Sequence, residues 1–400
     1  MTEEFVKEIA TLRAEDVLGQ LLLGEFPFAI WRLPNRELFS CVVSKSSEVN
    51  LKKIDLEELG AGFAMAPYSY TKHKSSVFIP ADIHFEFTQF EEELEPRVAE
   101  KLASIIDLNG KRSNTFSSSP IVFSEDLEEK NAFKEGVIKA SEAIEAGYFE
   151  KVVLSRKKEF QRPDDFSSLA HFKIVCEKHT GVFCSMTFLP WENEVWMGAS
   201  PESLVSQDQN GIFKTMALAG TQSSYDESNE EIATSDALWR QKEIEEQALV
   251  SRYIINCFKK IRVREFAELG PKSVRAGNLI HLQTAFEVDT KTIEFPQLGS
   301  IMLDLLHPTS AVCGMPKIPS QEFIDQTEYY DRKYYAGFLG PVNINECTDL
   351  FVNLRTMRAS STTLSLYAGC GITAGSNPEK EWNESEIKLK TIVAQYPKTH

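Results

Sequence analysis

Strand-like and helix-like segments follow one another in an irregular order along this chain. Apolar runs typical of strands lie at 152–160, 182–189, 194–199, 212–218, 280–288, 334–342, 350–358 and 363–370. Helices are predicted at 126–146, 228–262, 319–333 and 378–396. Because single strands and helices do not alternate regularly, the order predicts an α+β fold with antiparallel strands. It argues against an α/β fold built from regular β-α-β units.

The first 125 residues carry weaker patterns. An opening helix is followed by a hairpin over 26–43 that turns around 33–36, and then by short apolar runs over 61–90. The polar stretch at 109–120 is the best candidate for a mobile loop or linker, with a plain exposed connection as the alternative. The length of 400 residues allows two to four ordinary domains or one large one.

The charge balance limits the partners. The chain has 43 Lys and Arg against 59 Asp and Glu, a net charge of −16. Nucleic-acid binding needs clustered cations, so this composition argues against a nucleic-acid partner and against docking on an anionic membrane. A small anionic substrate would need a local basic pocket.

The cysteines and the N-terminus favour a cytoplasmic location. The first residues lack a basic stretch followed by an apolar one, so no signal peptide is expected, and no apolar run of membrane-spanning length occurs. The seven cysteines are scattered without a CxxC pair, which fits reduced thiols and argues against a zinc site or disulfide framework.

Two glutamates on the long predicted helix are candidate metal ligands. Glu243 and Glu246 are three residues apart and share one face. The same row continues into the apolar residues Val250, Ile254 and Phe258, so the carboxylates extend a buried stripe. A buried carboxylate needs a cation or hydrogen-bond donors. A solvated charge run is the alternative.

The last predicted helix repeats this arrangement. Asn377 is a typical cap and is followed by a proline at the first helical position. Glu381 and Glu384 lie one turn apart, and Lys388 lies one turn beyond Glu384. The two helices together could hold a hard cation such as Mg²⁺, although Glu384 and Lys388 alone read as an ordinary surface pair.

Glycines and isolated charges mark further candidates. Glycine-containing segments at 198–202, 218–221 and 368–371 follow strands, where a ligand could approach the backbone, or are plain turns. Lys151 begins a strand and Arg355 is expected in mid-strand, which are unusual places for free charges. His281 alternates with apolar residues and reads first as a satisfied core histidine. No GxGxxG, P-loop, HExxH or GxSxG motif occurs.

Taken together, ordered segments over about two-thirds of the chain resemble the chorismate-utilising enzymes, and specifically the isochorismate synthases. The matching segments are 150–156 (EKVVLSR), 198–202 (GASPE), 218–221 (LAGT), 242–246 (KEIEE), 281–284 (HLQT), 307–309 (HPT), 335–337 (YAG), 353–355 (NLR), 368–371 (AGCG) and 381–384 (EWNE). The resemblance implies one large domain over 1–400 with two packed antiparallel sheets flanked by helices. In it, 1–125 would complete the sheets and 126–400 would form the catalytic core.

The resemblance also implies a cofactor and a substrate. Mg²⁺ would be held mainly by Glu246 and Glu384, with Glu243 and Glu381 supporting through water, and would bind the ring carboxylate of chorismate. The remaining substrate contacts implied are Leu218, Ala219, Gly220, Thr221, His281, Tyr335, Arg355, Gly369, Cys370, Gly371 and Lys388. Arg355 and the amides around Gly369 would take the carboxylate of the enolpyruvyl arm.

The implied reaction adds water at C2 of chorismate while the 4-hydroxyl leaves. Lys151 would be the general base, which requires an uncharged amine. Glu202 would be the general acid, which requires a carboxyl that stays protonated. His281 and Thr221 would position the ring and its hydroxyl.

The branch of the family is set by fewer residues. Ala219 stands where aminodeoxychorismate-forming relatives have a lysine nucleophile, which leaves room for water. It does not exclude anthranilate synthases, which add ammonia and also have alanine in this segment, but the surrounding residues 216–218 and Lys151 fit the isochorismate branch better. Tyr335 and Leu354 favour a salicylate synthase that also eliminates pyruvate, whereas Ala311 favours an isochorismate synthase. No glutaminase subunit is expected, and the resemblance favours a monomer. A non-catalytic anion- or Mg²⁺-binding relative is the remaining alternative. Gln247 replaces the family's usual histidine.

Overall fold

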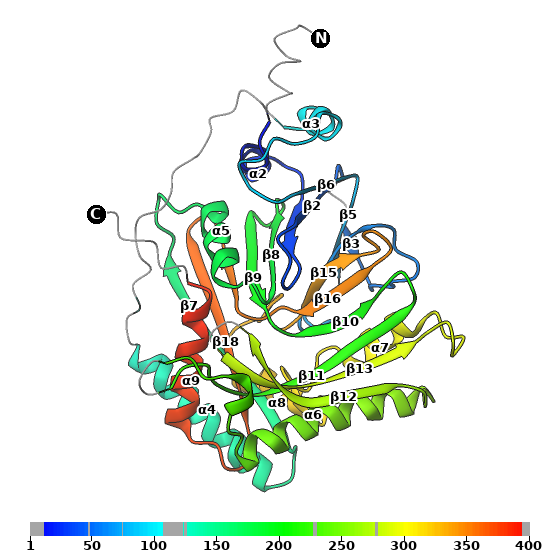
Figure 1. Ribbon diagram of the computed structural model, residues 1–400. Coiled ribbons are helices and arrows are strands. Elements are labelled where there is room, and N and C mark those ends of the chain that lie inside the picture. The colour runs from blue at the N-terminus through cyan, green and yellow to red at the C-terminus, as the bar shows by residue number, and fades with distance from the viewer. Residues whose placement is uncertain are drawn as a thin grey trace, which may run out of the picture.

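Two antiparallel sheets of nine strands each form the centre of the protein in the computed structural model (Figure 1). The structure describes residues 12–46, 49–73, 75–106, 123, 126–226, 230–276 and 279–393. The first sheet contains, in spatial order, β14 (Gly314–Met315), β7 (Lys151–Gln161), β18 (Thr363–Ile372), β17 (Thr356–Ala359), β9 (Glu194–Ser200), β8 (Phe183–Leu189), β1 (Phe28–Arg32), β2 (Phe39–Val43) and β6 (Ile83–Phe87). The second contains β12 (Ala267–Ala276), β13 (Leu279–Asp289), β11 (Ile212–Ser223), β10 (Ser203–Gln207), β16 (Thr348–Val352), β15 (Phe338–Val342), β4 (Gly62–Ala66), β5 (Ser76–Pro80) and β3 (Asn50–Leu51).

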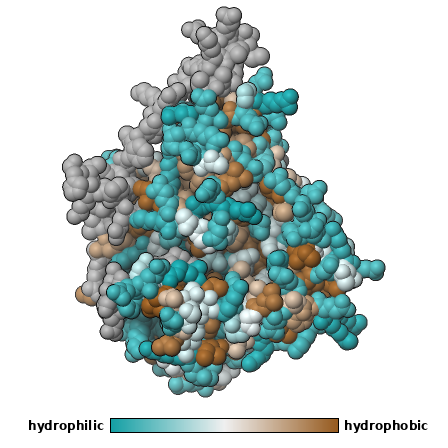
Figure 2. Space-filling view, viewed as in Figure 1, coloured by the Kyte–Doolittle hydropathy of each residue, from teal (hydrophilic) through white to brown (hydrophobic). Residues whose placement is uncertain are grey.

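Helices flank both sheets, which confirms the predicted α+β architecture. They are α2 (Ala14–Leu21), α3 (Pro96–Ala103), α4 (Leu127–Glu145), α5 (Ser168–Lys178), α6 (Gln241–Lys260), α7 (Leu298–Leu306), α8 (Lys317–Thr327) and α9 (Pro378–Thr391), with a 3₁₀ helix at Thr234–Asp236. In Figure 1, α2 and α3 lie at one end of the molecule and α4, α6 and α9 at the other. Hydrophilic residues cover most of the face in Figure 2, with apolar residues in small groups between them.

Strand β1 shows how one segment serves two cores. Ala29 and Trp31 belong to the apolar cluster between the sheets, whereas Phe28 and Ile30 belong to the cluster under α2, α3 and α5. Alternate side chains of a strand point to opposite faces, so a strand with apolar residues at every position is buried on both sides. The first sheet is therefore the middle layer of this part of the protein.

Strands from the first 90 residues pair with later strands in both sheets. β1 pairs with β8, and β4 pairs with β15. The predicted hairpin over 26–43 is confirmed as β1 and β2. The division of the chain into one domain stays a prediction. The predicted loop at 109–120 lies outside the described residues.

Several predicted boundaries are wrong. The long helix begins at Gln241 and not at 228, because residues 230–240 form a loop with the 3₁₀ helix. The strand predicted at 350–358 is two strands, β16 and β17, which belong to different sheets. The structure also contains elements that were not predicted, namely the strands β3, β10, β12 and β14 and the helices α3, α5 and α7. No described helix is both long and apolar enough to cross a bilayer.

Candidate active site

A cavity of about 170 Å³ lies where both sheets meet α6 and α9. Most of the predicted site residues line it: Lys151, Glu202, Leu218, Ala219, Gly220, Thr221, Glu243, Glu246, His281, Tyr335, Arg355, Gly369, Gly371, Glu384 and Lys388. They come from β7 and β18 of the first sheet, β11 and β13 of the second, both helices and the connecting loops. The fold thus gathers groups that lie up to 237 positions apart in the sequence, from Lys151 to Lys388.

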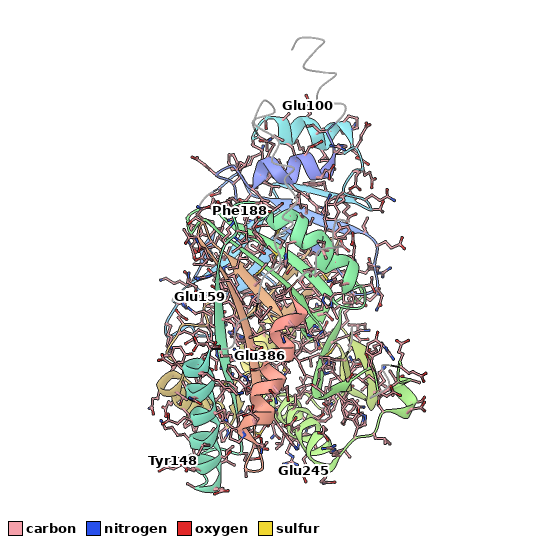
Figure 3. All side chains as sticks on the ribbon, turned by 90° about the vertical axis from the view of Figure 1, so that its left-hand side faces the viewer. Glu100, Tyr148, Glu159, Phe188, Glu245 and Glu386 are labelled. Atoms are coloured by element: carbon pink, nitrogen blue, oxygen red, sulfur yellow. The ribbon has the colours of Figure 1, made fainter. Side chains whose placement is uncertain are left out.

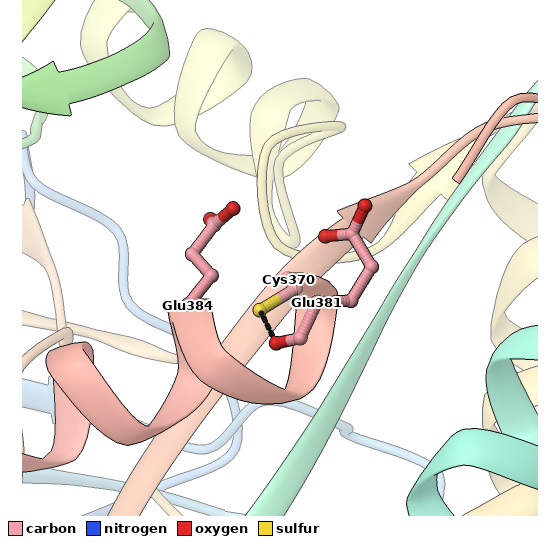
Figure 4. A group of neighbouring side chains, drawn as sticks. All are labelled: Cys370, Glu381 and Glu384. Atoms are coloured by element: carbon pink, nitrogen blue, oxygen red, sulfur yellow. Dashed lines mark hydrogen bonds between the residues drawn. The ribbon is translucent and has the colours of Figure 1, made fainter. Parts of the chain in front are cut away.

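Cys370, one of the predicted substrate contacts, does not line this cavity with its side chain, and a contact through the backbone amides of this segment stays a prediction. Cys370 lies on β18 between Gly369 and Gly371, and neighbouring side chains of a strand point to opposite faces. Its fully buried thiol donates to the backbone carbonyl of Glu381 over 3.2 Å (Figure 4). Burial raises the pKa of this thiol, so Cys370 packs α9 against the sheet as a neutral group.

Glu381 also lies outside the cavity lining, although it is close to a residue that lines it. Its side chain is buried, and a carboxylate oxygen lies within 4.8 Å of one from Glu384 and of the Cys370 thiol. Figure 4 shows both carboxylates extending from successive turns of α9. Glu381 therefore lies next to Glu384, outside the residues that line the cavity.

Lys151 and Glu202 are both buried in the wall of the cavity. Lys151 is the first residue of β7, where it pairs with Met315 of β14. Glu202 follows β9 and accepts a hydrogen bond from the Thr309 hydroxyl over 3.4 Å. Burial raises the pKa of Glu202 to about 7, and the nearby positive charge of Lys151 acts in the opposite direction. Glu202 therefore keeps a proton for much of the time near neutral pH.

His281 is held as a neutral imidazole by two fixed partners. Its Nδ1 lies 3.1 Å from the Gly220 carbonyl and 3.2 Å from the Thr221 hydroxyl, and its Nε2 lies 3.3 Å from a guanidinium nitrogen of Arg355. A carbonyl can only accept and a guanidinium can only donate, which places the proton on Nδ1. Burial and the Arg355 charge lower the pKa of His281 to about 3.

Arg355 lies in the connection between β16 and β17 and not in mid-strand as predicted. Its φ of +46° breaks the extended backbone at the point where the chain passes from one sheet to the other. Burial lowers the pKa of Arg355 to about 10, so the side chain remains a cation at neutral pH. The break turns this buried cation toward the cavity.

Lys388 supplies a second cation. Its ammonium lies 2.7 Å from the Glu384 carboxylate and donates to the Gly369 carbonyl over 2.9 Å. Burial alone lowers the pKa of Lys388, but the Glu384 carboxylate outweighs this effect and raises it overall. Both members of this pair line the cavity, so they do not form the ordinary surface pair that was the alternative from their spacing alone.

The carboxylates of α6 divide their roles. Glu243 accepts a hydrogen bond from the Arg240 backbone over 2.9 Å, so it caps the helix as well as lining the cavity. Glu246, one turn on, also lines the cavity. Gln247 is buried and donates to the Ala217 carbonyl and the Thr284 hydroxyl, which ties α6 to β11 and β13.

Some lining residues carried no chemical signal in the sequence. They are Val153, Pro201, Leu279, Val312, Tyr367 and Ala368. Arg332 links two of these residues, because its guanidinium donates to the backbone carbonyls of Val153 and Val312 over 2.8 Å each. Arg332 is paired with Glu328, four residues earlier, and the spacing of this pair on a predicted helix is the only sequence signal that could have found it.

The comparisons with known proteins agree with this geometry. The family model described as "Chorismate binding enzyme" matches residues 52–396. The chain belongs to the chorismate binding enzyme family.

Among curated proteins, the chain is 25% identical over 287 residues to isochorismate synthase DhbC of Bacillus subtilis (strain 168), covering 70% of each chain. It is 27% identical over 259 residues to isochorismate synthase MenF of Escherichia coli (strain K12), covering 64% of this chain and 58% of that one.

Two solved structures show the same fold. MenF, the menaquinone-specific isochorismate synthase from Escherichia coli, superposes with a TM-score of 0.73 at 21% identity, covering 94% of this chain and 91% of that one. Anthranilate synthase component I from Streptococcus pneumoniae TIGR4 superposes with a TM-score of 0.66 at 20% identity, covering 91% and 89%.

Proposed function

We propose that this protein is an isochorismate synthase, which converts chorismate to isochorismate. The observation that carries the proposal is the placement of Lys151 and Glu202 in one cavity, with the pKa of Glu202 raised to about 7. A carboxyl that holds a proton beside a lysine supplies an acid and a base within one site. The names of the curated relatives support the same reaction.

The two residues divide the proton transfers of the reaction. Lys151 takes a proton from the water that attacks C2 of the ring. Glu202 gives its proton to the departing 4-hydroxyl, which leaves as water. Ala219 lines the cavity with a methyl group, so this position offers no competing amine nucleophile.

Cations in the cavity suit a substrate with two carboxylates. The buried Arg355, together with the amides around Gly369, would take the carboxylate of the enolpyruvyl arm, and the half-buried Lys388 would lie beside the metal-bound carboxylate, while the protein as a whole carries a charge of −16. His281, as a fixed neutral group, and Thr221 would orient the ring.

The carboxylates of α6 and α9 fit a hard divalent cation. Glu246 and Glu384 line the cavity from the two helices, with Glu243 and Glu381 next to them. Oxygen ligands from carboxylates are those that Mg²⁺ prefers. When bound, Mg²⁺ would neutralise the ring carboxylate of chorismate and hold it against the two helices.

A salicylate synthase is the second candidate. Tyr335 and Leu354, which favour that branch, both line the cavity, and so does Ala311, which favours the isochorismate branch. The monomeric state, the lack of a glutaminase subunit and the cytoplasmic location stay predictions.

Product analysis tests the proposal. The protein is incubated with chorismate and Mg²⁺, and the products are separated by chromatography, with and without ammonia. Isochorismate as the product supports the proposal. Salicylate with pyruvate would select the second candidate, anthranilate on adding ammonia would select a third branch, and no product would overturn catalysis altogether. Lys151→Ala should abolish turnover in folded protein, and Glu202→Gln should leave only a low residual rate.

A further inference from the structure

Glu202 separates the catalytic cavity from a second, much smaller chamber. This chamber measures about 10 Å³ and is enclosed between β10, β11, α6, α7 and the loop that follows α7. Glu202 lines both spaces. A volume of this size holds one water molecule, provided that polar groups surround it. Glu202 therefore lies between the substrate cavity and a water-sized space.

Ser310 lines the chamber with an uncommitted hydroxyl. The residue is 2% exposed, and its Oγ has no hydrogen-bond partner among the described residues. A buried hydroxyl without a partner is unfavourable by about 1–3 kcal/mol, so native proteins rarely leave one unpaired. Because Ser310 lines the chamber, a water molecule in the chamber would give this hydroxyl a hydrogen-bond partner.

The other polar groups of the chamber leave acceptor positions open. The Tyr253 hydroxyl donates to the Leu305 carbonyl and the Thr215 hydroxyl donates to the Leu204 carbonyl, each over 2.7 Å. Each hydroxyl oxygen keeps a lone pair that can accept. Together with Ser310 and Glu202, they give a water molecule the two to four partners that it needs.

We propose that this chamber holds one structural water molecule, shared by Ser310 and Glu202, which makes Ser310 a positioning residue for the proton of the general acid. The acid role of Glu202 rests on the proposed function, whereas the water site rests on the chamber alone. A donor at the back of the carboxyl holds it in one orientation and favours its charged form. Thr309 and the chamber water thus bind Glu202 from outside the substrate cavity.

The other ionisable groups near Glu202 belong to the substrate cavity and to α6. Lys151 of β7 acts on it directly from the cavity side. Tyr253 of α6 is the titratable group on the chamber side, and burial raises its pKa far above neutral pH. The other ionisable groups of the cavity are Glu243, Glu246, His281, Tyr335, Arg355, Tyr367, Glu384 and Lys388. None of these is altered by a change at Ser310.

Matched variants at Ser310 test the proposal. Threonine and valine have the same shape, but only threonine keeps the hydroxyl, and alanine removes the hydroxyl without adding volume. The titration of Glu202 is followed by ¹³C NMR in protein labelled at the glutamate carboxyl carbons, with the resonance assigned by its loss in Glu202→Gln. The measurement uses the full chain without substrate.

The expected midpoint for Ser310→Val and Ser310→Ala lies about half to one pH unit above that of the parent protein. Ser310→Thr should titrate as the parent does. A crystal structure should show one water within hydrogen-bond distance of Ser310 Oγ and the Glu202 carboxyl. Identical midpoints for the valine and threonine variants, or a dry chamber in the crystal, would overturn the proposal. Failure to convert chorismate would overturn the proposed function and leave this result standing.

Discussion

Gly371 faces the side chain of Lys151 so closely that a Cβ at this position would stand 2.9 Å from Cε and 3.3 Å from Nζ of the lysine. The same point lies 3.9 Å from a carboxylate oxygen of Glu246. Because Gly371 of β18 has no side chain, the end of the Lys151 side chain has room to lie beside this strand. A glycine on the neighbouring strand therefore leaves room for the amine that we propose as the general base.

We therefore expect Gly371→Ala to impair turnover more than stability. The end of a lysine side chain can move aside, so the added methyl should change the melting temperature little. The amine would nevertheless leave its position, and a displacement of about 1 Å can lower catalysis by tenfold to a hundredfold. Steady-state kinetics with chorismate and thermal unfolding measure the two effects separately.

Gly375→Ala is the control for that substitution. A Cβ at Gly375, in the loop before α9, would meet nothing within 4 Å, and the residue is exposed. Its kcat/KM should equal that of the parent protein. If Gly371→Ala kept the same kcat/KM as this control, the position of the Lys151 amine would not matter for the reaction.

A pH–rate profile tests the role of Glu202. With a pKa of about 7, the acid form is lost as pH rises through neutrality. We expect kcat/KM to fall above pH 7, approaching about tenfold per pH unit. Glu202→Gln should have a low residual rate without this alkaline limb. A parent profile that stays flat to pH 9 would exclude Glu202 as the general acid.

The Glu202 carboxyl should also make the stability of the protein depend on pH. Its folded pKa lies above the ordinary value of 4.5, so the folded state binds the proton more tightly than the unfolded state. The stability that this provides is full below pH 4.5 and is lost as pH rises through about 7, with a total of ~3 kcal/mol. Urea unfolding at pH 4.5 and pH 8 should show this loss in the parent protein and not in Glu202→Gln. Equal pH dependence in both proteins would mean that the carboxyl is not buried as a neutral group.

The sequence allowed a prediction of the site residues that lie in a recognisable motif or pattern. Lys151 and the glutamates of α6 were found because charges at the start of a strand and on an apolar helix face are unusual, whereas the role of Glu202 was implied only by the resemblance. The break at Arg355 could not be found, because the local pattern over 350–358 reads as one strand and only the packing of two sheets divides it. The apolar walls such as Val153 were missed because they carry no chemical signal. The outward side of Cys370 follows from the alternation of side chains along a strand, which a motif match alone does not include.

Two glutamates should be necessary for binding of Mg²⁺. Glu246→Gln and Glu384→Gln each remove one carboxylate from the cavity, and each should weaken Mg²⁺ binding by at least about tenfold in isothermal titration calorimetry. Glu245→Gln is the matched control on the same helix, since Glu245 is exposed at the lower edge of Figure 3. Removal of the metal with a chelator should abolish turnover. Equal affinities in all three variants would place the metal elsewhere.

His281 should remain uncharged throughout the working range. Its pKa of about 3 lies well below neutral pH, so the ring is neutral from pH 5 to pH 8 and cannot cause an acidic limb in the rate profile. Two-dimensional ¹H–¹⁵N spectra of the imidazole should show the Nδ1–H tautomer at every pH in that range. A ring that titrates near pH 6 would mean that Arg355 does not pack against it.

The buried pair of Arg332 and Glu328 should be a main support of the cavity wall. Their side chains are 3% and 5% exposed, and Arg332 also binds the carbonyls of Val153 and Val312. Arg332→Met would leave Glu328 as an uncompensated buried charge, so we expect a loss of about 3–5 kcal/mol in the free energy of unfolding. Because the lost charge is the cause, the double variant Arg332→Met with Glu328→Gln should recover part of that loss. A double variant less stable than Arg332→Met would show that the backbone hydrogen bonds of Arg332, and not its charge, hold the wall.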